Sequence, residues 1–202
     1  NQKVDQYRLA GKRAYCIPTG ASDAIGLWGY IDASRELKAD FSQHNINPEH
    51  IICATGSGGT QAGLTLGAEL FDLNTKVWGV NVCDDEKYFH DKVIADIQDW
   101  KQQYGHSIDI SSIIPRTLDG YVGPGYGLAD DEVIDAINML ARLEGIVLDP
   151  VYTGKALYAM LEELKKGRFA GSKDIVFVHT GGALGLFPFK ERLQARASLL
   201  VN

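Results

Sequence analysis

The sequence has few residues that could form a disulfide framework or a metal site. It contains three cysteines and five histidines, and they lack the spacing of metal ligands. An odd number of cysteines also argues against a disulfide framework. We therefore expect buried thiols in a reducing compartment, which favours the cytoplasm, and no metal. The cysteines concerned are Cys16, Cys53 and Cys83.

The sequence also lacks an excess of positive charge and any long hydrophobic run. Its 26 acidic residues outnumber 20 basic ones, for a formal net charge of −6. Phosphate backbones select basic surfaces, so this balance argues against nucleic acid as a partner. No apolar run approaches the length of a membrane span, so we expect no membrane partner either.

The most informative stretch that is present runs from His50 to Phe71, HIICATGSGGTQAGLTLGAELF. Residues 51–54 predict a buried strand, residues 56–60 a tight turn, and the apolar spacing beyond them a helix. Such a turn points unpaired backbone N–H groups at one place, where the helix dipole favours a phosphate. The expected anion-binding residues are Gly56, Ser57, Gly58, Gly59 and Thr60.

Glycine fits this turn because a Cβ would stand between the anion and the amides. The turn misses two common phosphate-binding patterns. Leu64 stands where the Walker pattern needs lysine, and Gln61 stands where the dinucleotide fingerprint needs its third glycine. A purely structural turn is the alternative interpretation. Gly63 and Gly67 are predicted to let the following helix lie close to the sheet.

Near-continuous apolar strands alternate with helical patterns, which predicts an α/β fold: a mostly parallel sheet with helices on both faces. Strands are expected at 14–17, 51–54, 76–83 and 175–178, and a long functional loop at 105–128. Ser22 is expected to cap the helix that follows it. Ligands collect at the carboxyl ends of parallel strands, where segments 56–60, 149–155 and 179–182 would meet.

These segments, in this order, resemble the pyridoxal-phosphate enzymes that include 1-aminocyclopropane-1-carboxylate deaminase and D-cysteine desulfhydrase. The matching motifs are IPTGASDAIGLWGY (17–30), ATGSGGTQAG (54–63), GPGYG (123–127), LDPVYTGKA (148–156) and HTGG (179–182). The resemblance implies a tryptophan-synthase-β-like fold and pyridoxal 5′-phosphate as cofactor. It also implies that residues 1–45 end a small domain and connect it to a large cofactor-binding domain at 46–202.

The same resemblance implies roles for individual residues. The turn at 56–60 would hold the cofactor phosphate, and Tyr126 and Tyr152 would be catalytic, flanking the ring and the substrate. Thr153 and Thr180 would bind the cofactor near its pyridine nitrogen. The cyclopropane deaminases carry glutamate at the position of Thr153 and leucine at that of Thr180, so this sequence looks like the desulfhydrase version. A hydroxyl supports the electron-withdrawing ring less than a carboxylate does, but a thiolate leaves readily.

The expected reaction is β-elimination from a small D-amino acid, D-cysteine, giving pyruvate, ammonia and sulfide, in a homodimer. One alternative is 1-aminocyclopropane-1-carboxylate deamination. Another is a dinucleotide-binding oxidoreductase domain, which would use the glycine turn with Asp84 and Asp85. A third is a chain without activity.

The resemblance also implies that the Schiff-base lysine and the carboxylate-binding segment precede Asn1. Lys155 lies within a motif, but it begins a helix in the family pattern and is not expected to be that lysine. The sequence is therefore expected to be the later part of an enzyme, able to bind cofactor but inactive alone.

Overall fold

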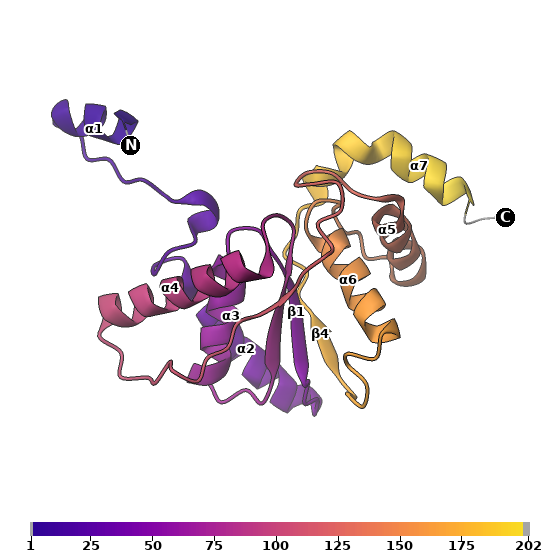
Figure 1. The fold of residues 1–202 in the computed structure, drawn as a ribbon, viewed down its shortest axis with the longest axis horizontal. Helices are drawn as coiled ribbons and strands as arrows, with labels where there is room; N and C mark the ends of the chain where they lie inside the picture. Colours follow the sequence, from indigo (N-terminus) through magenta and orange to yellow (C-terminus); the bar gives the residue numbers. More distant parts are fainter. Residues whose placement is uncertain (1, 200–202) are drawn as a thin grey trace.

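The computed structural model describes residues 2–199 and shows a four-stranded parallel sheet between two groups of helices (Figure 1). The sheet order is β3-β2-β1-β4, and every neighbouring pair is parallel. The strands are β1 (His50–Thr55), β2 (Lys76–Asn81), β3 (Arg116–Leu118) and β4 (Ile175–Phe177). This architecture confirms the predicted α/β fold with helices on both faces.

One group of helices comes from the first half of the chain and the other from the second half (Figure 1). The first group is α2 (Leu27–His44), α3 (Gly59–Leu70) and α4 (Glu86–Tyr104). The second is α5 (Asp131–Glu144), α6 (Thr153–Lys165) and α7 (Lys190–Leu199). Two short 3-10 helices are η1 (Thr19–Ala21) and η2 (Ala183–Phe189), and α1 (Gln2–Leu9) extends away from the body without a buried residue.

The central strand β1 is buried on both faces, and its side chains alternate between the two helix groups. Ile51 and Cys53 pack with residues of α2 and α3, whereas Ile52 and Ala54 pack with residues of α6. A strand covered on both sides needs apolar residues at successive positions, which explains the continuous apolar run in its sequence.

Helix α3 is packed closely against α2 through two glycines. A Cβ on Gly63 would lie 2.6 Å from the Cβ of Tyr30, and one on Gly67 would lie 2.3 Å from the Oγ of Ser34. These glycines therefore face α2, and the prediction that they bring α3 close to the sheet is wrong. Glycine lets the two helix backbones approach, at a cost in helix propensity.

The start of the chain differs from the sequence prediction. Residues 14–17 form no strand, and Tyr15 and Ile17 are exposed. Cys16 in this segment is exposed and Cys83 is only partly buried, so the expectation of three buried thiols holds for Cys53 alone. An apolar run gives a strand only where a neighbouring strand accepts its hydrogen bonds, and this segment has none within the described residues.

The predicted loop at 105–128 contains the short strand β3, which pairs with β2. The predicted domain boundary at residue 45 stays a prediction, although α2, before that boundary, packs directly on α3 after it. The predicted domain limits at Asn1 and at 200–202 lie outside the described residues. Within residues 2–199, no helix is both long and apolar enough to cross a membrane.

Candidate active site

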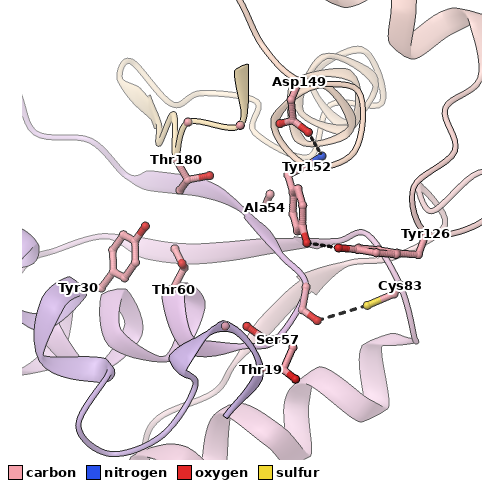
Figure 2. A pocket seen from close by; sticks show the side chains of 14 residues that line it. Thr19, Tyr30, Ala54, Ser57, Thr60, Cys83, Tyr126, Asp149, Tyr152 and Thr180 are labelled. Carbon is pink, nitrogen blue, oxygen red and sulfur yellow. Dashed lines mark hydrogen bonds between the residues drawn. The ribbon is translucent and has the colours of Figure 1, made fainter. Parts of the chain in front are cut away.

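A cavity of about 660 Å³ lies at the carboxyl end of the sheet, where β1, β2 and β4 end (Figure 2). This is the edge at which parallel sheets bind ligands. Residues from three distant segments line it, as the order of the motifs predicted. Of the predicted site residues, six line this cavity: Gly56, Ser57, Thr60, Tyr126, Tyr152 and Thr180.

The turn at 56–60 offers backbone donors to a ligand. Gly58 adopts a left-handed conformation, with φ at +93°, and α3 starts immediately after it. Within the described residues, the N–H groups of Ser57, Gly58 and Thr60 have no acceptor. Unpaired amides at the positive end of a helix dipole are an anion site, so this turn fits a phosphate.

The glycines of this turn are required for a different reason from the predicted one. A Cβ on Gly56 would lie 2.9 Å from Cε1 of Tyr152, and one on Gly58 would lie 3.1 Å from Cγ of Lys92. A Cβ on Gly59 would lie 2.6 Å from Oγ of Ser22. Each glycine therefore lets a neighbouring element approach the turn, and the Cβ atoms would strike protein rather than shield the amides.

Ser22 caps a helix other than the predicted one. Its Oγ accepts the N–H of Gly59 at 2.9 Å, so it caps α3 across a separation of 37 residues. At the N-terminus of α2, which Ser22 was expected to cap, Asp23 instead accepts the N–H of Gly26 at 2.8 Å.

Two tyrosines form the opposite side of the cavity (Figure 2). The hydroxyl groups of Tyr126 and Tyr152 are hydrogen-bonded to each other, and their rings meet edge to face with centroids 5.9 Å apart. Burial, followed by the hydrogen bond from Tyr126, raises the pKa of Tyr152 above its usual value. The Tyr152 phenol thus stays protonated near neutral pH, and a phenol hydroxyl can donate or accept a hydrogen bond.

Lys155 holds the loop that carries Tyr126. Its side chain is fully buried, and its Nζ donates hydrogen bonds to the carbonyl oxygens of Val122 at 2.6 Å and Gly125 at 2.9 Å. Burial lowers the pKa of this ammonium group. Lys155 does not line the cavity, which agrees with the expectation that it is not the cofactor lysine.

Asp149 organises the start of α6 and closes the cavity near β4. Its carboxylate accepts the backbone N–H groups of Val151, Tyr152 and Thr153, each at 2.8 Å, and the hydroxyl of Thr153 at 2.7 Å. A Cβ on Gly182 would lie 2.8 Å from its Cγ, so the segment 179–182 packs directly on it.

Thr153 therefore does not occupy the place that the sequence predicted. It is fully buried and does not line the cavity. Its hydroxyl donates to the Asp149 carboxylate and accepts the Asp149 N–H at 3.0 Å. Because α6 begins here, the Thr153 side chain turns back to the helix cap instead of toward the ligand. Thr180, by contrast, points its hydroxyl at the cavity (Figure 2).

Sequence reasoning missed several lining residues. Thr19, Gly20 and Tyr30 belong to the motif at 17–30, and Asp149 belongs to the motif at 148–156, so their motifs were the available signal. Cys83 follows β2, and its Sγ donates to the carbonyl oxygen of Gly56 at 3.4 Å. Burial, with Asp84 adding to it, raises the pKa of Cys83 to about 11, so this thiol is a weak nucleophile near neutral pH.

Other candidate residues have structural partners. Asp85 caps α4 by accepting the N–H of Tyr88 at 2.7 Å. Asp85 is one of the two carboxylates that the dinucleotide alternative would use, so it already has a structural role. His179 lies at the surface, and its Nε2 lies 3.0 Å from the carbonyl oxygen of Val147. The described residues contain no cluster of side chains able to hold a metal ion.

Comparison with known proteins identifies related sequences. Residues 2–181 match the family model described as pyridoxal-phosphate dependent enzyme. A bifunctional D-cysteine desulfhydrase/1-aminocyclopropane-1-carboxylate deaminase, mitochondrial, of Arabidopsis thaliana is 37% identical over an alignment of 205 residues, which covers 100% of this chain and 49% of that protein. A putative 1-aminocyclopropane-1-carboxylate deaminase of Thermotoga maritima is 37% identical over 184 residues, 91% of this chain and 56% of that protein.

Solved structures show the same similarity. An ACC deaminase homologue superposes with a TM-score of 0.84 at 31% identity, covering 96% of this chain and 57% of the other. Threonine deaminase isoform 2 from Solanum lycopersicum superposes with a TM-score of 0.58 at 14% identity, covering 96% and 55%, a likeness of fold alone. The chain spans about half the length of the curated relatives it matches.

Proposed function

Because the chain belongs to the family of pyridoxal-phosphate dependent enzymes, we propose that its site serves β-elimination from a small D-amino acid. The proposed substrate is D-cysteine, which with water gives pyruvate, ammonia and sulfide. The family and the cofactor are those that the motifs predicted. The choice of substrate and reaction is our proposal.

The residues present fit pyridoxal phosphate. The unpaired amides of Ser57, Gly58 and Thr60 suit its phosphate, and the cavity continues from this turn to Tyr152 and Thr180. When bound, the cofactor withdraws electrons from the carbon beside the substrate amino group. The task of the chain is to fix the phosphate, orient the ring and place proton donors near that carbon.

One observation supports elimination of a good leaving group. Asp149 is the one carboxylate among the described residues that line the cavity, and three backbone amides and a hydroxyl already bind it. We propose that the pyridine nitrogen meets the neutral hydroxyl of Thr180 instead. A neutral partner keeps the ring nitrogen less protonated, which suits a thiolate leaving group better than the opening of an unactivated ring.

The tyrosine pair is the proposed proton donor. Tyr152 has a raised pKa and stays protonated near neutral pH, and its hydrogen bond to Tyr126 joins the two hydroxyls. Tyr126 is 58% exposed, so it links the cavity to solvent. We propose that Tyr152 presents a proton to the substrate and regains one through Tyr126.

The test uses an enzyme that contains this chain together with a cofactor-binding lysine and is loaded with pyridoxal phosphate. It compares the rate of sulfide and pyruvate release from D-cysteine with the rate of ammonia release from 1-aminocyclopropane-1-carboxylate. We expect turnover of D-cysteine only. Preferential turnover of 1-aminocyclopropane-1-carboxylate would contradict our proposal and favour the deaminase reaction. The names of both curated relatives include that deaminase.

Among the described residues no lysine lines the cavity. We therefore expect the 202-residue polypeptide, assayed by itself, to bind the cofactor without turnover, and the reaction to need an amino group from outside these residues. A full turnover rate from this polypeptide alone would contradict that expectation.

Two further points are proposals. The resemblance suggests a homodimer, which light scattering on the purified protein tests. The three cysteines form no disulfide and suit a reducing compartment such as the cytoplasm, whereas the Arabidopsis relative carries the word mitochondrial in its name.

A further inference from the structure

Ser22 lies behind the anion-binding turn rather than in the cavity. It is buried, with 7% of its surface exposed, and it does not line the cavity. Its Oγ accepts the N–H of Gly59 at 2.9 Å and donates to the Oγ of Ser57 at 2.7 Å. Ser57 does line the cavity, so a single buried hydroxyl joins the helix α3 to a side chain that faces the ligand.

The segment around Ser22 is held firmly against the turn. A Cβ on Gly20 would lie 2.1 Å from the Oγ of Ser57, so only glycine permits this approach. Nζ of Lys92, on α4, donates to the carbonyl oxygen of Ser22 at 3.3 Å. Ser22 is thus fixed from both its backbone and its side chain.

The donors and acceptors in this chain of hydrogen bonds have a defined order. A serine hydroxyl has one proton to donate. Ser22 accepts from Gly59 and gives its proton to Ser57, and Ser57 must then direct its own proton elsewhere. Within the described residues, no protein atom accepts that proton, and the cavity lies beside it. The Ser57 hydroxyl is therefore set as a donor toward an anion.

We propose that Ser22 is a positioning residue that orients the Ser57 hydroxyl to donate a hydrogen bond to the phosphate of the bound ligand. This inference rests on the proposed function, because it assumes that a phosphate ester occupies the turn. Hydrogen bonds in a chain also polarise one another, which strengthens the last donor.

The experiment compares the affinity of the protein for pyridoxine 5′-phosphate and for pyridoxine by isothermal titration calorimetry. Neither probe has an aldehyde, so neither needs a lysine. We expect Ser22→Ala to weaken binding of the phosphate ester roughly 3- to 10-fold, the worth of one hydrogen bond, and to leave pyridoxine binding unchanged. Ser42→Ala, at an exposed serine of α2, is the matched control and should change neither affinity.

A double substitution tests whether Ser22 acts through Ser57. Ser57→Ala should lower the affinity for the phosphate ester, and adding Ser22→Ala should lower that affinity by no more than about a further twofold. The proposal is overturned if Ser22→Ala leaves the affinity for the ester unchanged or lowers the affinity for pyridoxine equally. It is also overturned if the losses of the two single variants multiply in full in the double variant.

Two provisions keep the test decisive. If Ser22→Ala does not fold, Ser22→Cys, whose thiol has a similar shape but donates weakly, should show the same selective loss. If the wild-type protein binds inorganic phosphate but not the ester, the cofactor proposal fails, while the same variants tested with inorganic phosphate still decide the role of Ser22. Binding of neither probe would overturn both proposals.

Discussion

The ammonium group of Lys155 donates a hydrogen bond to the carbonyl oxygen of Gly125 at 2.9 Å, from a side chain that is fully buried in α6. Gly125 immediately precedes Tyr126, so this contact ties Tyr126 to α6, the helix that begins directly after Tyr152. The second acceptor, the carbonyl oxygen of Val122, lies at the other end of the same short loop. The two tyrosines meet because one buried lysine holds both ends of the loop.

Lys155→Met should free the loop at 122–127. The substitution leaves two carbonyl groups without their donor, which costs about 1–3 kcal/mol, offset in part by removal of a buried charge. Amide hydrogen exchange of residues 122–127 should accelerate at least tenfold, a measurement that mass spectrometry can make. Lys173→Met, at an exposed lysine, is the control and should leave this exchange unchanged. Unaltered protection in Lys155→Met would contradict the assigned role.

Tyr126→Phe should lower the pKa of Tyr152. Burial raises that pKa first and the hydrogen bond from Tyr126 second, so removing the hydroxyl should remove only part of the shift. Carbon-13 labelling of the tyrosine Cζ atoms lets NMR follow each phenol with pH, with Tyr152→Phe assigning the signal. A Tyr152 that titrates identically in both proteins would show that the two hydroxyls are not coupled.

Gly182→Ala should cost more stability than Gly181→Ala. Both glycines have φ near +90°, 93° for Gly182 and 95° for Gly181, so both substitutions strain the backbone by about 1–2 kcal/mol. Only at Gly182 would the new Cβ collide with Asp149, because no atom lies within 4 Å of the corresponding position at Gly181. We expect an additional loss of about 1–3 kcal/mol in the free energy of unfolding by urea. Equal losses would mean that Asp149 does not pack against this segment.

His50 should make stability fall as the pH is lowered from about 7 toward 5. Its Nδ1 accepts the indole N–H of Trp78 at 3.0 Å, which requires the neutral ring, and burial lowers its pKa below 6.5. Between that lowered pKa and 6.5 the unfolded state binds more protons than the folded state, so the free energy of unfolding decreases as pH falls through this window. Well above the pKa of His50 in the unfolded state, both states are unprotonated at His50 and this loss of stability is absent.

The measurement is urea unfolding at several pH values in this range. In His50→Phe the fall in the free energy of unfolding across this pH window should disappear. In His44→Phe, at an exposed histidine, it should remain. A slope that survives in His50→Phe would assign the pH dependence to another group.

The sequence predicted those features that depend on local pattern. The apolar run at 51–54 predicted the buried strand β1, and the glycine turn after it predicted the start of α3. Both features depend on residues that are adjacent in the sequence. The motif order placed Tyr126, Tyr152 and Thr180 around one cavity.

The sequence could not predict features that depend on contacts between distant residues. An apolar segment at 14–17 forms no strand because no neighbouring strand is available to it among residues 2–199. Thr153 turns to Asp149, and Ser22 caps α3 rather than the adjacent helix, because partners 4 and 37 residues away compete for each hydroxyl. Glycines at 56, 58 and 59 make room for Tyr152, Lys92 and Ser22, which no local pattern reveals.

The central claim is that the turn at 56–60 holds the phosphate of pyridoxal phosphate while Tyr152 and Thr180 face its ring. The most direct measurement is the change in backbone amide chemical shifts on adding pyridoxal phosphate to the nitrogen-15-labelled protein. We predict the largest changes at Ser57, Gly58 and Thr60, with a second group at residues 180–182. Changes confined to other parts of the chain, or none in the turn at saturating cofactor, would contradict the account.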